Sequence, residues 1–591
     1  MRSGIAGRVF TCAIVLVACL FLSLAAMAQS TVSGAIGGIV MDQQKAVVPG
    51  AQVTVKNLGT NREDSAESDA AGRFRVGNLQ PGTYSLSITA GSFAPYKQQG
   101  VVVEVGRITE IEAALGVAGK GEVVEVTGEA PAIQTEQHDF TANINQTSIN
   151  ELPINGRRWS QYALLTPGAT PDGDFGLISF RGISGLLNNN TVDGGDNNQA
   201  FFSEEKGRTR IQYNVGQASI QEFQVNTSNF SAEYGRAAGG VVNAVTKSGT
   251  NRFHGGVFYY IRDNELGATN PFAVQAILVN GVATTVPIKP IDRRQQWGGT
   301  LGGPLKKDKL FFFFSYDQQA RNFPGVAAFG QPTFLNLTTA QTTALLAPPN
   351  NLTQAQINSG LAFLQGIAGV VPRRGDQMLI FPKIDWQITP SNRLTLSYNR
   401  LRWDSPAGIQ TQAVVNRGIA SFGDDFVKTD SIIARLSSVL GKSATNEFRY
   451  QWGRDFEFEN SQPPGPGEPA TGIGGRPPDV TIGGGSGIEI GKPTFLERKA
   501  FPDERRHQVA DTLTMNWGRH LFKLGFDINH VEDLQDNLRN EGGSYSYSSL
   551  SGFLIDLFNP ARKQYSNYVQ AFGPTAFRFT TMDYGFFFQD D

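Results

Sequence analysis

The residues that could carry out chemistry are few in this chain and lie far apart. The five histidines include no pair at the i, i+4 spacing that places two zinc ligands on one helix face. They are His138, His254, His507, His520 and His530. Ser486 lies in a glycine-rich stretch that lacks the Gly-x-Ser-x-Gly spacing of a nucleophile motif. These patterns predict a protein that is not an enzyme and that needs no metal and no other cofactor.

The N-terminus has the composition of a targeting segment. Arg2 and Arg8 precede an apolar stretch that ends in the small residues Ala26-Met27-Ala28, which predicts a signal peptide over residues 1–28. A membrane anchor and a lipoprotein site at Cys19 are alternatives, but the apolar run continues past Cys19 and favours cleavage after Ala28. The only two cysteines, Cys12 and Cys19, lie within this segment. The exported chain would then have neither disulfides nor thiol chemistry.

The overall composition predicts many strands and turns. The chain has 591 residues with 67 glycines, 10% aromatic residues and only 18% charged residues. A formal net charge of -2 gives no indication of a nucleic-acid partner. No apolar run of about 20 residues follows the N-terminus, so a membrane-embedded chain would have to cross as a closed barrel.

Residues 253–591 show the two-residue alternation of strands that have one apolar and one polar face. Phe448, Tyr450 and Trp452, for example, alternate with Arg449 and Gln451. Because a soluble sandwich shows the same alternation, the connections must decide between the two folds. Short joins are predicted near 304–309, 389–392, 441–445 and 518–520, and long ones near 264–292, 318–375, 404–428, 460–505 and 531–581.

This alternation of short and long connections is typical of a transmembrane barrel with tight periplasmic turns and long outer loops. The pattern predicts about ten strands, whereas outer-membrane transporters with a plugged lumen have roughly 22. Because an open sheet edge is not tolerated in lipid, we expect residues 253–591 to be the first part of a barrel in a C-terminally truncated chain.

Residues 35–117 contain short strand-like runs separated by Pro49-Gly50, Ala71-Gly72 and Pro81-Gly82, a spacing that indicates a small β-sandwich. From Gly38-Ile39-Val40 to Leu79–Tyr84 the segment resembles the carboxypeptidase regulatory-like domain, a transthyretin/Ig-like fold. The resemblance implies a binding or spacer role without peptidase chemistry.

Residues 122–250 combine short strands, Asn/Gly turns and helical stretches. Five motifs occur in order: Leu152–Arg157, Ser179–Gly182, Val192–Asn197, Ile220–Val225 and Ala232–Asn243. Asp193–Asn197 has some features of a calcium loop but lacks its spaced acidic positions, which favours a hairpin turn. The ordered motifs resemble the plug domain of TonB-dependent outer-membrane receptors, in particular the Oar-like branch, and the resemblance extends to Tyr316.

The resemblance implies roles for particular residues. Charged plug residues would pair with one another or with lumen-facing charges and hold the plug, while two glycines would allow close packing. The plug motif residues are Arg157, Arg181, Asp193, Glu222, Glu233, Arg236, Gly239 and Gly240. The segment Glu122-Val123-Val124-Glu125-Val126-Thr127 lies where the family has its TonB box, a peptide that adds to a partner's sheet. The alternative is that this segment is the last strand of the sandwich.

The predicted protein is mainly β, with a β-sandwich, an α+β plug and a partial antiparallel transmembrane β-barrel. The resemblance implies uptake of a siderophore, vitamin or oligosaccharide through the outer membrane, energised by the TonB/ExbB/ExbD inner-membrane complex. The sandwich and the TonB box would face the periplasm, and outer-membrane lipid would surround the barrel. The alternatives are an adhesin or scaffold, and an export-associated channel.

Overall fold

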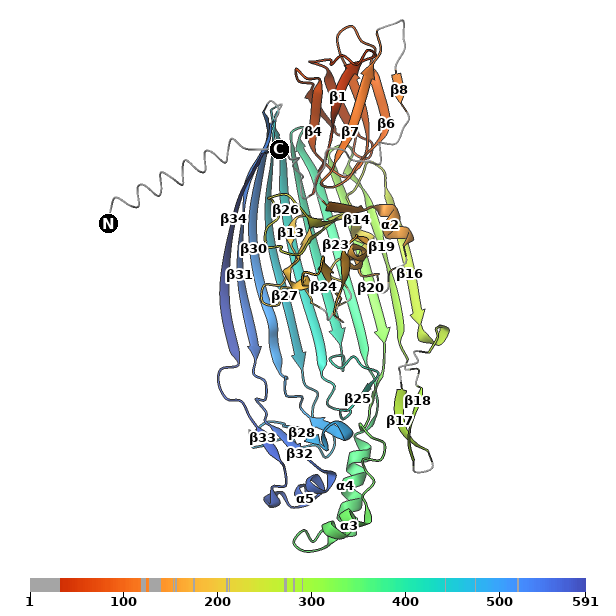
Figure 1. The fold of residues 1–591 in the computed structure, drawn as a ribbon, viewed down its shortest axis with the longest axis vertical. Coiled ribbons are helices and arrows are strands. Elements are labelled where there is room, and N and C mark those ends of the chain that lie inside the picture. Colours follow the sequence, from red (N-terminus) through yellow and green to blue (C-terminus); the bar gives the residue numbers. More distant parts are fainter. Residues whose placement is uncertain are drawn as a thin grey trace, which may run out of the picture.

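The computed structural model describes residues 32–117, 124–126, 140–152, 154, 157–173, 176–208, 211, 213–269, 274–279, 282–287, 289, 291–441, 443–473, 475–517 and 520–590. The predicted signal peptide lies outside these residues, as do His138 and three residues of the TonB-box candidate, Glu122, Val123 and Thr127. The described part contains a sandwich, a plug, a curved ten-stranded wall and a cap formed by long loops (Figure 1).

The sandwich consists of two facing sheets. The strands are β1 (Gly34–Asp42), β2 (Gln52–Asn57), β3 (Glu63–Glu67), β4 (Arg73–Leu79), β5 (Gly82–Thr89), β6 (Tyr96–Val103), β7 (Ile108–Leu115) and β8 (Val124–Val126). One sheet has the order β4-β1-β7 and the other β3-β2-β5-β6-β8. Alternate residues such as Val53, Val55, Leu86 and Ile88 point inward and form the core between the sheets.

The plug is built around a mixed five-stranded sheet of order β13-β12-β15-β14-β9. Its strands are β9 (Phe140–Ile144), β12 (Asn189–Val192), β13 (Gly195–Asp196), β14 (Ile220–Ser228) and β15 (Val241–Thr246). A smaller hairpin joins β10 (Ala169–Asp172) to β11 (Leu177–Phe180), and the helices are α2 (Gln146–Glu151), η2 (Trp159–Leu165), η3 (Gly185–Leu187) and η4 (Gln217–Ser219). The plug core also contains Leu379, Trp403 and Val427 of the wall, so plug and wall share buried contacts.

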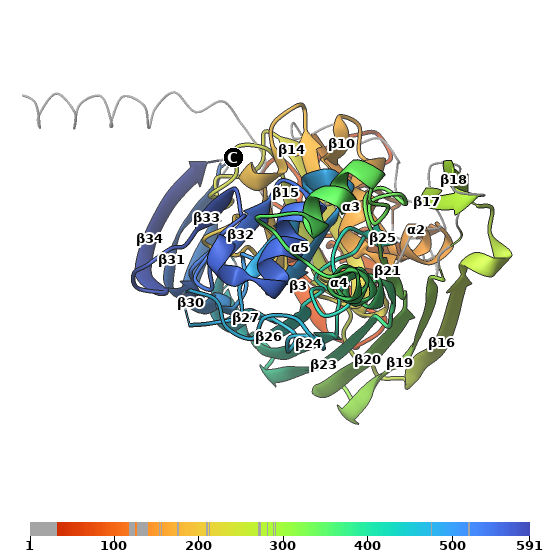
Figure 2. The ribbon, with the colours of Figure 1, turned by 90° about the horizontal axis from the view of Figure 1, so that it is seen from below.

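The wall is one antiparallel sheet in which each strand pairs with the next wall strand along the chain. Its strands are β16 (His254–Asp263), β19 (Arg293–Lys306), β20 (Leu310–Asn322), β23 (Arg374–Thr389), β24 (Asn392–Ser405), β26 (Asp424–Leu440), β27 (Ala444–Asn460), β30 (Arg498–Trp517), β31 (His520–Asn537) and β34 (Ala576–Asp590). Figure 2 shows these strands as an arc that curves around the plug. The short turns and long connections lie where the sequence predicts them.

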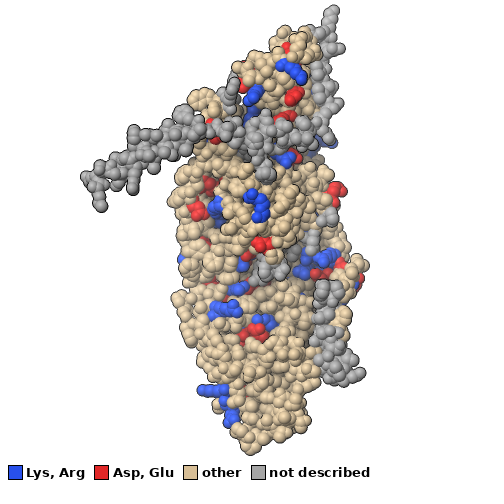
Figure 3. All heavy atoms as spheres, viewed as in Figure 1, with Lys and Arg blue, Asp and Glu red and all other residues tan. Residues whose placement is uncertain are grey.

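The two faces of the wall have opposite polarity. Phe448 points outward and is 40% exposed, whereas Gln451 points toward the plug and is 2% exposed. Ile432 and Leu396 repeat this outward apolar pattern on neighbouring strands. An apolar outer face and a polar lumen are typical of a transmembrane barrel. Figure 3 shows the side of the molecule on which the plug lies, where Lys, Arg, Asp and Glu occur in scattered patches. Among the described residues, no helix is long and apolar enough to cross a membrane.

The long connections contain strands and helices of their own, which the spacing of the wall strands does not predict. Strands β28 (Asp479–Ile482), β29 (Ile488–Gly491), β32 (Ser544–Tyr547) and β33 (Asn567–Val569) form a sheet of order β29-β28-β32-β33. Helices α3 (Thr339–Leu346), α4 (Gln354–Gly366) and α5 (Leu550–Phe558) pack with this sheet around a shared core. Residues such as Ile482, Ile488 and Leu554 are buried there, and this burial stabilises short strands that turn signals alone do not reveal.

We call these helices and this sheet the outer cap, because they lie at the end of the wall opposite the sandwich (Figure 1). The remaining elements are short. They are β17 (Val274–Val279), β18 (Val282–Pro287), β21 (Gly325–Ala327), β22 (Gly369–Val371), β25 (Val414–Val415), η5 (Asn264–Leu266), η6 (Gly484–Ser486) and η7 (Pro560–Arg562).

Candidate functional site

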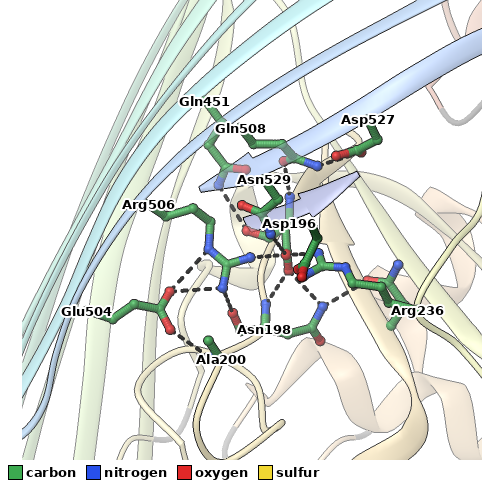
Figure 4. Close-up of polar contacts among 12 residues, drawn as sticks. Asp196, Asn198, Ala200, Arg236, Gln451, Glu504, Arg506, Gln508, Asp527 and Asn529 are labelled. Atoms are coloured by element: carbon green, nitrogen blue, oxygen red, sulfur yellow. Dashed lines mark hydrogen bonds and ion pairs between the residues drawn. The ribbon is translucent and has the colours of Figure 1, made fainter. Parts of the chain in front are cut away.

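A cluster of polar contacts between plug and wall is centred on Asp196 (Figure 4). The Asp193-Gly194 turn between β12 and β13 has positive φ at both residues, as a two-residue hairpin requires, and carries Asp196 to the wall. The Asp196 carboxylate accepts hydrogen bonds from the guanidinium groups of Arg506 on β30 and Arg236 of the plug. The Asn529 amide of β31 donates a third bond at 3.1 Å.

Arg506 is held from several sides. Its guanidinium donates to Glu504 Oε1 at 2.9 and 3.1 Å and to the backbone carbonyl of Asn198 at 2.7 Å. The Arg506 side chain is 0% exposed and that of Asp196 is 1% exposed. Because a buried charge is stable only when it is paired and hydrogen-bonded, this arrangement fixes the tip of the plug hairpin against the wall.

The wall also binds the backbone of Asp196. The Asp196 N–H donates to Gln508 Oε1 at 3.0 Å, and its carbonyl accepts from Gln451 Nε2 at 2.9 Å. These amide side chains replace the neighbouring strand that β13 lacks on this side. The contacts are noncovalent, so the cluster can hold or release the plug without a chemical step.

A second buried ion pair joins Lys383 of β23 to Asp193 of the plug, with 3.6 Å between Lys383 Nζ and Asp193 Oδ2. Thr246 bridges the two, since its hydroxyl donates to Asp193 at 2.6 Å and accepts from Lys383 at 2.9 Å. Burial alone would raise the pKa of Asp193, but Lys383 and the Thr246 hydrogen bonds lower the pKa below its ordinary value.

A third ion pair joins Glu233 of the plug to Lys523 of β31, with 2.5 Å between Oε1 and Nζ. The side chains are 5% and 3% exposed, respectively. Burial raises the pKa of Glu233, and the Lys523 ammonium opposes only part of that rise.

Glu222 contacts the sandwich instead of the wall. The backbone N–H of Val105, in the β6–β7 turn, donates to Glu222 Oε1, while Asn143 of β9 donates to the Val105 carbonyl at 3.0 Å. Burial raises the pKa of Glu222 to about 8, and the Val105 N–H opposes part of that rise. The β6–β7 turn therefore docks directly on the plug sheet.

The other side of the sandwich contacts the short turns of the wall. Asn61 donates to Asp308 Oδ1 at 3.0 Å, and Arg62 donates to Gln387 Oε1 at 3.4 Å. The Asn251 N–H, at the start of the wall, donates to the Gly59 carbonyl at 2.8 Å. These contacts fix the sandwich beside the ends of β19, β20, β23 and β24.

The remaining predicted site residues lie in different surroundings. Arg157 stacks over the ring of Phe258 at 4.6 Å, and Arg181 is exposed at a turn with no ion pair to any described residue. The close packing predicted for the glycines is present, since a Cβ on Gly239 would lie 2.3 Å from Asn188 Oδ1 and one on Gly240 2.5 Å from Phe180 Cδ2. The described part of the TonB-box candidate, β8, pairs in parallel with β6 of the sandwich.

Sequence reasoning did not identify the wall partners Lys383, Arg506 and Lys523. The available signal was their position on the polar face of an alternating strand.

The structure also pairs His507 with His530 across β30 and β31, with ring centroids 6.5 Å apart. Within the described part of the chain, no group of three or more His, Cys, Asp or Glu residues could hold a metal ion. The hairpin predicted at Asp193–Asn197 is confirmed by the β12–β13 pairing.

Comparisons with known proteins agree with this architecture. The carboxypeptidase regulatory-like domain matches residues 35–116. The chain is 30% identical over 311 residues to the TonB-dependent transporter Oar of Myxococcus xanthus, covering 51% of this chain and 28% of that protein. The chain thus spans little more than a quarter of the length of this relative.

The solved structures similar to this chain include the outer membrane transporter YddB of Escherichia coli, with a TM-score of 0.49 and 12% identity over 76% of this chain and 54% of that chain. Another is the siderophore receptor PirA of Acinetobacter baumannii, with a TM-score of 0.42 and 15% identity over 68% of this chain and 49% of that chain.

The profile of the outer membrane beta barrel domain matches residues 245–591, which include the whole wall and the outer cap. Together with the apolar outward face of the wall, this match places the protein in the outer membrane. The chain therefore belongs to the outer membrane beta barrel domain family.

Proposed function

We propose that the protein takes up a scarce ligand across the outer membrane through a plugged barrel and that the TonB complex supplies the energy. The observation that carries the proposal is the set of buried ion pairs between plug and wall at Asp196, Asp193 and Glu233. These noncovalent contacts keep the lumen closed at rest and can re-form after the plug has moved. The similarity to a TonB-dependent transporter supports this reading.

The energy must reach the plug through a segment that the inner-membrane complex can grip. The TonB-box candidate meets this requirement, because the described residues of β8 pair with Tyr96, Lys97 and Gln98 at the edge of a sandwich sheet. An extended peptide at a sheet edge can exchange this pairing for the edge of a partner's sheet. The plug sheet begins at β9, the next strand after β8. Tension on β8 would therefore act first on that strand and its neighbour β14.

The ligand would enter from the outer-cap side, and its class is a siderophore, a vitamin or an oligosaccharide. Polar inward-facing residues of the wall suit any of these hydrophilic solutes. A panel of labelled ferric siderophores, cobalamin and maltooligosaccharides distinguishes the three classes, because cells that express the protein should accumulate members of only one.

The test of energised uptake is a backbone change in β8. Val126→Pro removes the backbone N–H that strand addition to a partner needs, whereas Val126→Ala keeps it. We expect Val126→Pro to abolish accumulation of the panel solute, and capture by the purified TonB C-terminal domain, with membrane insertion intact. Val126→Ala should retain both. Equal accumulation by the two variants would contradict energised uptake, and no accumulation of any solute by the parent protein would favour an outer-membrane scaffold. Movement of the solute outward would favour an export channel.

A further inference from the structure

A cavity of about 110 Å³ lies where the sandwich, the plug and the wall meet. Its wall side is the inner face of the sheet beside the turns that join β26 to β27 and β30 to β31. Its other side is formed by the sandwich, chiefly the start of β1 and the residues of β4. We call this space the junction cleft.

The docked position of the sandwich leaves the junction cleft open. The sandwich binds the wall turns near Asp308 and Gln387, which belong to the β19–β20 and β23–β24 side of the sheet. The β6–β7 turn binds the plug at Glu222. Gly106 and Arg107 of the same turn line the junction cleft, so the cleft lies beside this anchor and is open while the sandwich is docked.

The plug contributes Glu233 to the junction cleft, and the wall contributes its partner Lys523. In the β30–β31 register, Lys523 lies opposite Thr514, whereas Ala510 lies four residues farther from the periplasmic turn on the same face. Ala510 is 7% exposed and does not line the cleft. Thr512, between these two positions on the same face, still lines the cleft, so the cleft ends between Thr512 and Ala510, beside the ion pair.

The lining of the cleft combines small polar side chains with the charged Asp64, Arg75, Arg107 and Glu447. Hydroxyl and amide side chains of Thr445, Thr512, Thr514 and Asn516 face Ser33 and Asn78 of the sandwich. Such groups exchange hydrogen bonds with a hydrophilic solute without binding it as tightly as paired charges would. A transported solute needs a surface of this kind where it leaves the lumen.

We propose that the junction cleft is the periplasmic exit of the transport path and that the Glu233–Lys523 ion pair is its gate. This inference rests on the proposed function, since an exit has meaning only for a transporter. Separation of the two side chains joins the cleft to the plug–wall boundary at Ala510. The docked sandwich forms the side of the exit that faces the wall. Solutes therefore leave between the sandwich and the ends of β26, β27, β30 and β31.

The gate can be tested without knowledge of the ligand. The only native cysteines, Cys12 and Cys19, lie in the predicted signal peptide, so Ala510→Cys provides a single reporter thiol. The probe is a small cationic methanethiosulfonate reagent added to the purified full chain, and the readout is the rate of thiol modification. Glu233→Gln and Lys523→Gln each break the pair, while Glu233→Lys combined with Lys523→Glu restores it in reverse.

We expect either single variant to raise the modification rate at Ala510→Cys roughly tenfold or more, because one partner of a buried pair is lost. The charge-reversed double variant should return the rate to within about twofold of the parent. Gln319→Cys, fully buried on β20, is the matched control and should stay slow in every background. The gate is refuted by an unchanged rate at Ala510→Cys, by an equal rise at Gln319→Cys, or by a double variant that does not recover. Since these rates need no uptake, they are independent of the Val126→Pro result.

Discussion

Asp196 of the plug and Arg506 of strand β30 form an ion pair in which neither side chain has appreciable contact with solvent. They are 310 positions apart in the sequence. Arg506 also neutralises Glu504, and Asp196 is shared with Arg236, so the cluster contains two acids and two bases. This balance allows burial of Asp196, Glu504 and Arg506, which would be costly if any one of them were alone, while Arg236 is 41% exposed.

Removal of Arg506 should therefore destabilise the plug strongly. Arg506→Ala leaves two buried carboxylates without their main partner, which is expected to cost about 3–5 kcal/mol. The measurement is the free energy of unfolding of the plug in urea. Arg505→Ala is the control, since Arg505 is 57% exposed and its loss should cost less than about 1 kcal/mol. Equal effects of the two variants would show that burial of the Asp196 cluster contributes nothing to the free energy of unfolding of the plug.

Close packing at the end of the plug motif gives a second prediction. A Cβ on Gly240 would lie 2.5 Å from Phe180 Cδ2 and 3.0 Å from the Asn226 carbonyl. Gly240→Ala should then destabilise the plug by about 1–3 kcal/mol through overpacking. Gly235→Ala is the matched control, because nothing lies within 4 Å of its added Cβ. A thermal unfolding midpoint that falls no further for Gly240→Ala than for Gly235→Ala would contradict this account.

The wall could be predicted from sequence because its signals are local. Alternation along β27 assigns Phe448 and Gln451 to opposite faces, and short polar turns fix where each hairpin reverses. The plug could be located from its ordered motifs, but the wall residues that pair with it could not be predicted. Glu233 belongs to such a motif, but Lys523 lies 290 residues away and is only one of many inward-facing polar residues. Its role depends on how deeply the plug sits in the lumen.

The outer cap could not be predicted from the sequence, for a similar physical reason. Strands β28 and β32 pair in parallel at Val480 and Tyr545, yet each has only four residues and they belong to different loops. Glycine and proline near residues 463–467 correctly indicate turns. The stability of the cap comes instead from long-range burial of residues such as Ile482 and Leu554, which no local pattern reveals.

The sandwich–plug contact should depend on pH through Glu222. Its pKa is raised from the ordinary 4.5 to about 8, chiefly by burial, so the docked state binds a proton that the exposed carboxylate releases. Docking is therefore strongest below about pH 4.5 and weakens as the pH rises toward about 8. Glu222→Gln keeps an acceptor for the Val105 N–H without the charge. The stability difference between Glu222→Gln and the parent should grow with pH, by at most about 1.4 kcal/mol per unit.

Calorimetric unfolding midpoints from pH 5 to pH 8 measure this difference. Glu63→Gln is the control, because Glu63 lies on β3 of the same sandwich, is 56% exposed and pairs with Lys56. The offset between Glu63→Gln and the parent should be small beside that of Glu222→Gln. A constant offset between Glu222→Gln and the parent would mean that Glu222 does not titrate in this range.

The outer cap should unfold separately from the wall, because it has its own core. Leu554 of α5 is fully buried, and its side chain packs against Gly360 of α4. Leu554→Ala should destabilise the cap by about 2–5 kcal/mol through the lost burial and the remaining cavity. Leu557→Ala on the same helix is the control, since Leu557 is 37% exposed. Limited proteolysis within residues 538–575 should speed up for Leu554→Ala alone, while the wall stays folded. Loss of wall stability in the same variant would show that cap and wall form one cooperative unit, because the cavity would then weaken contacts well beyond the cap core.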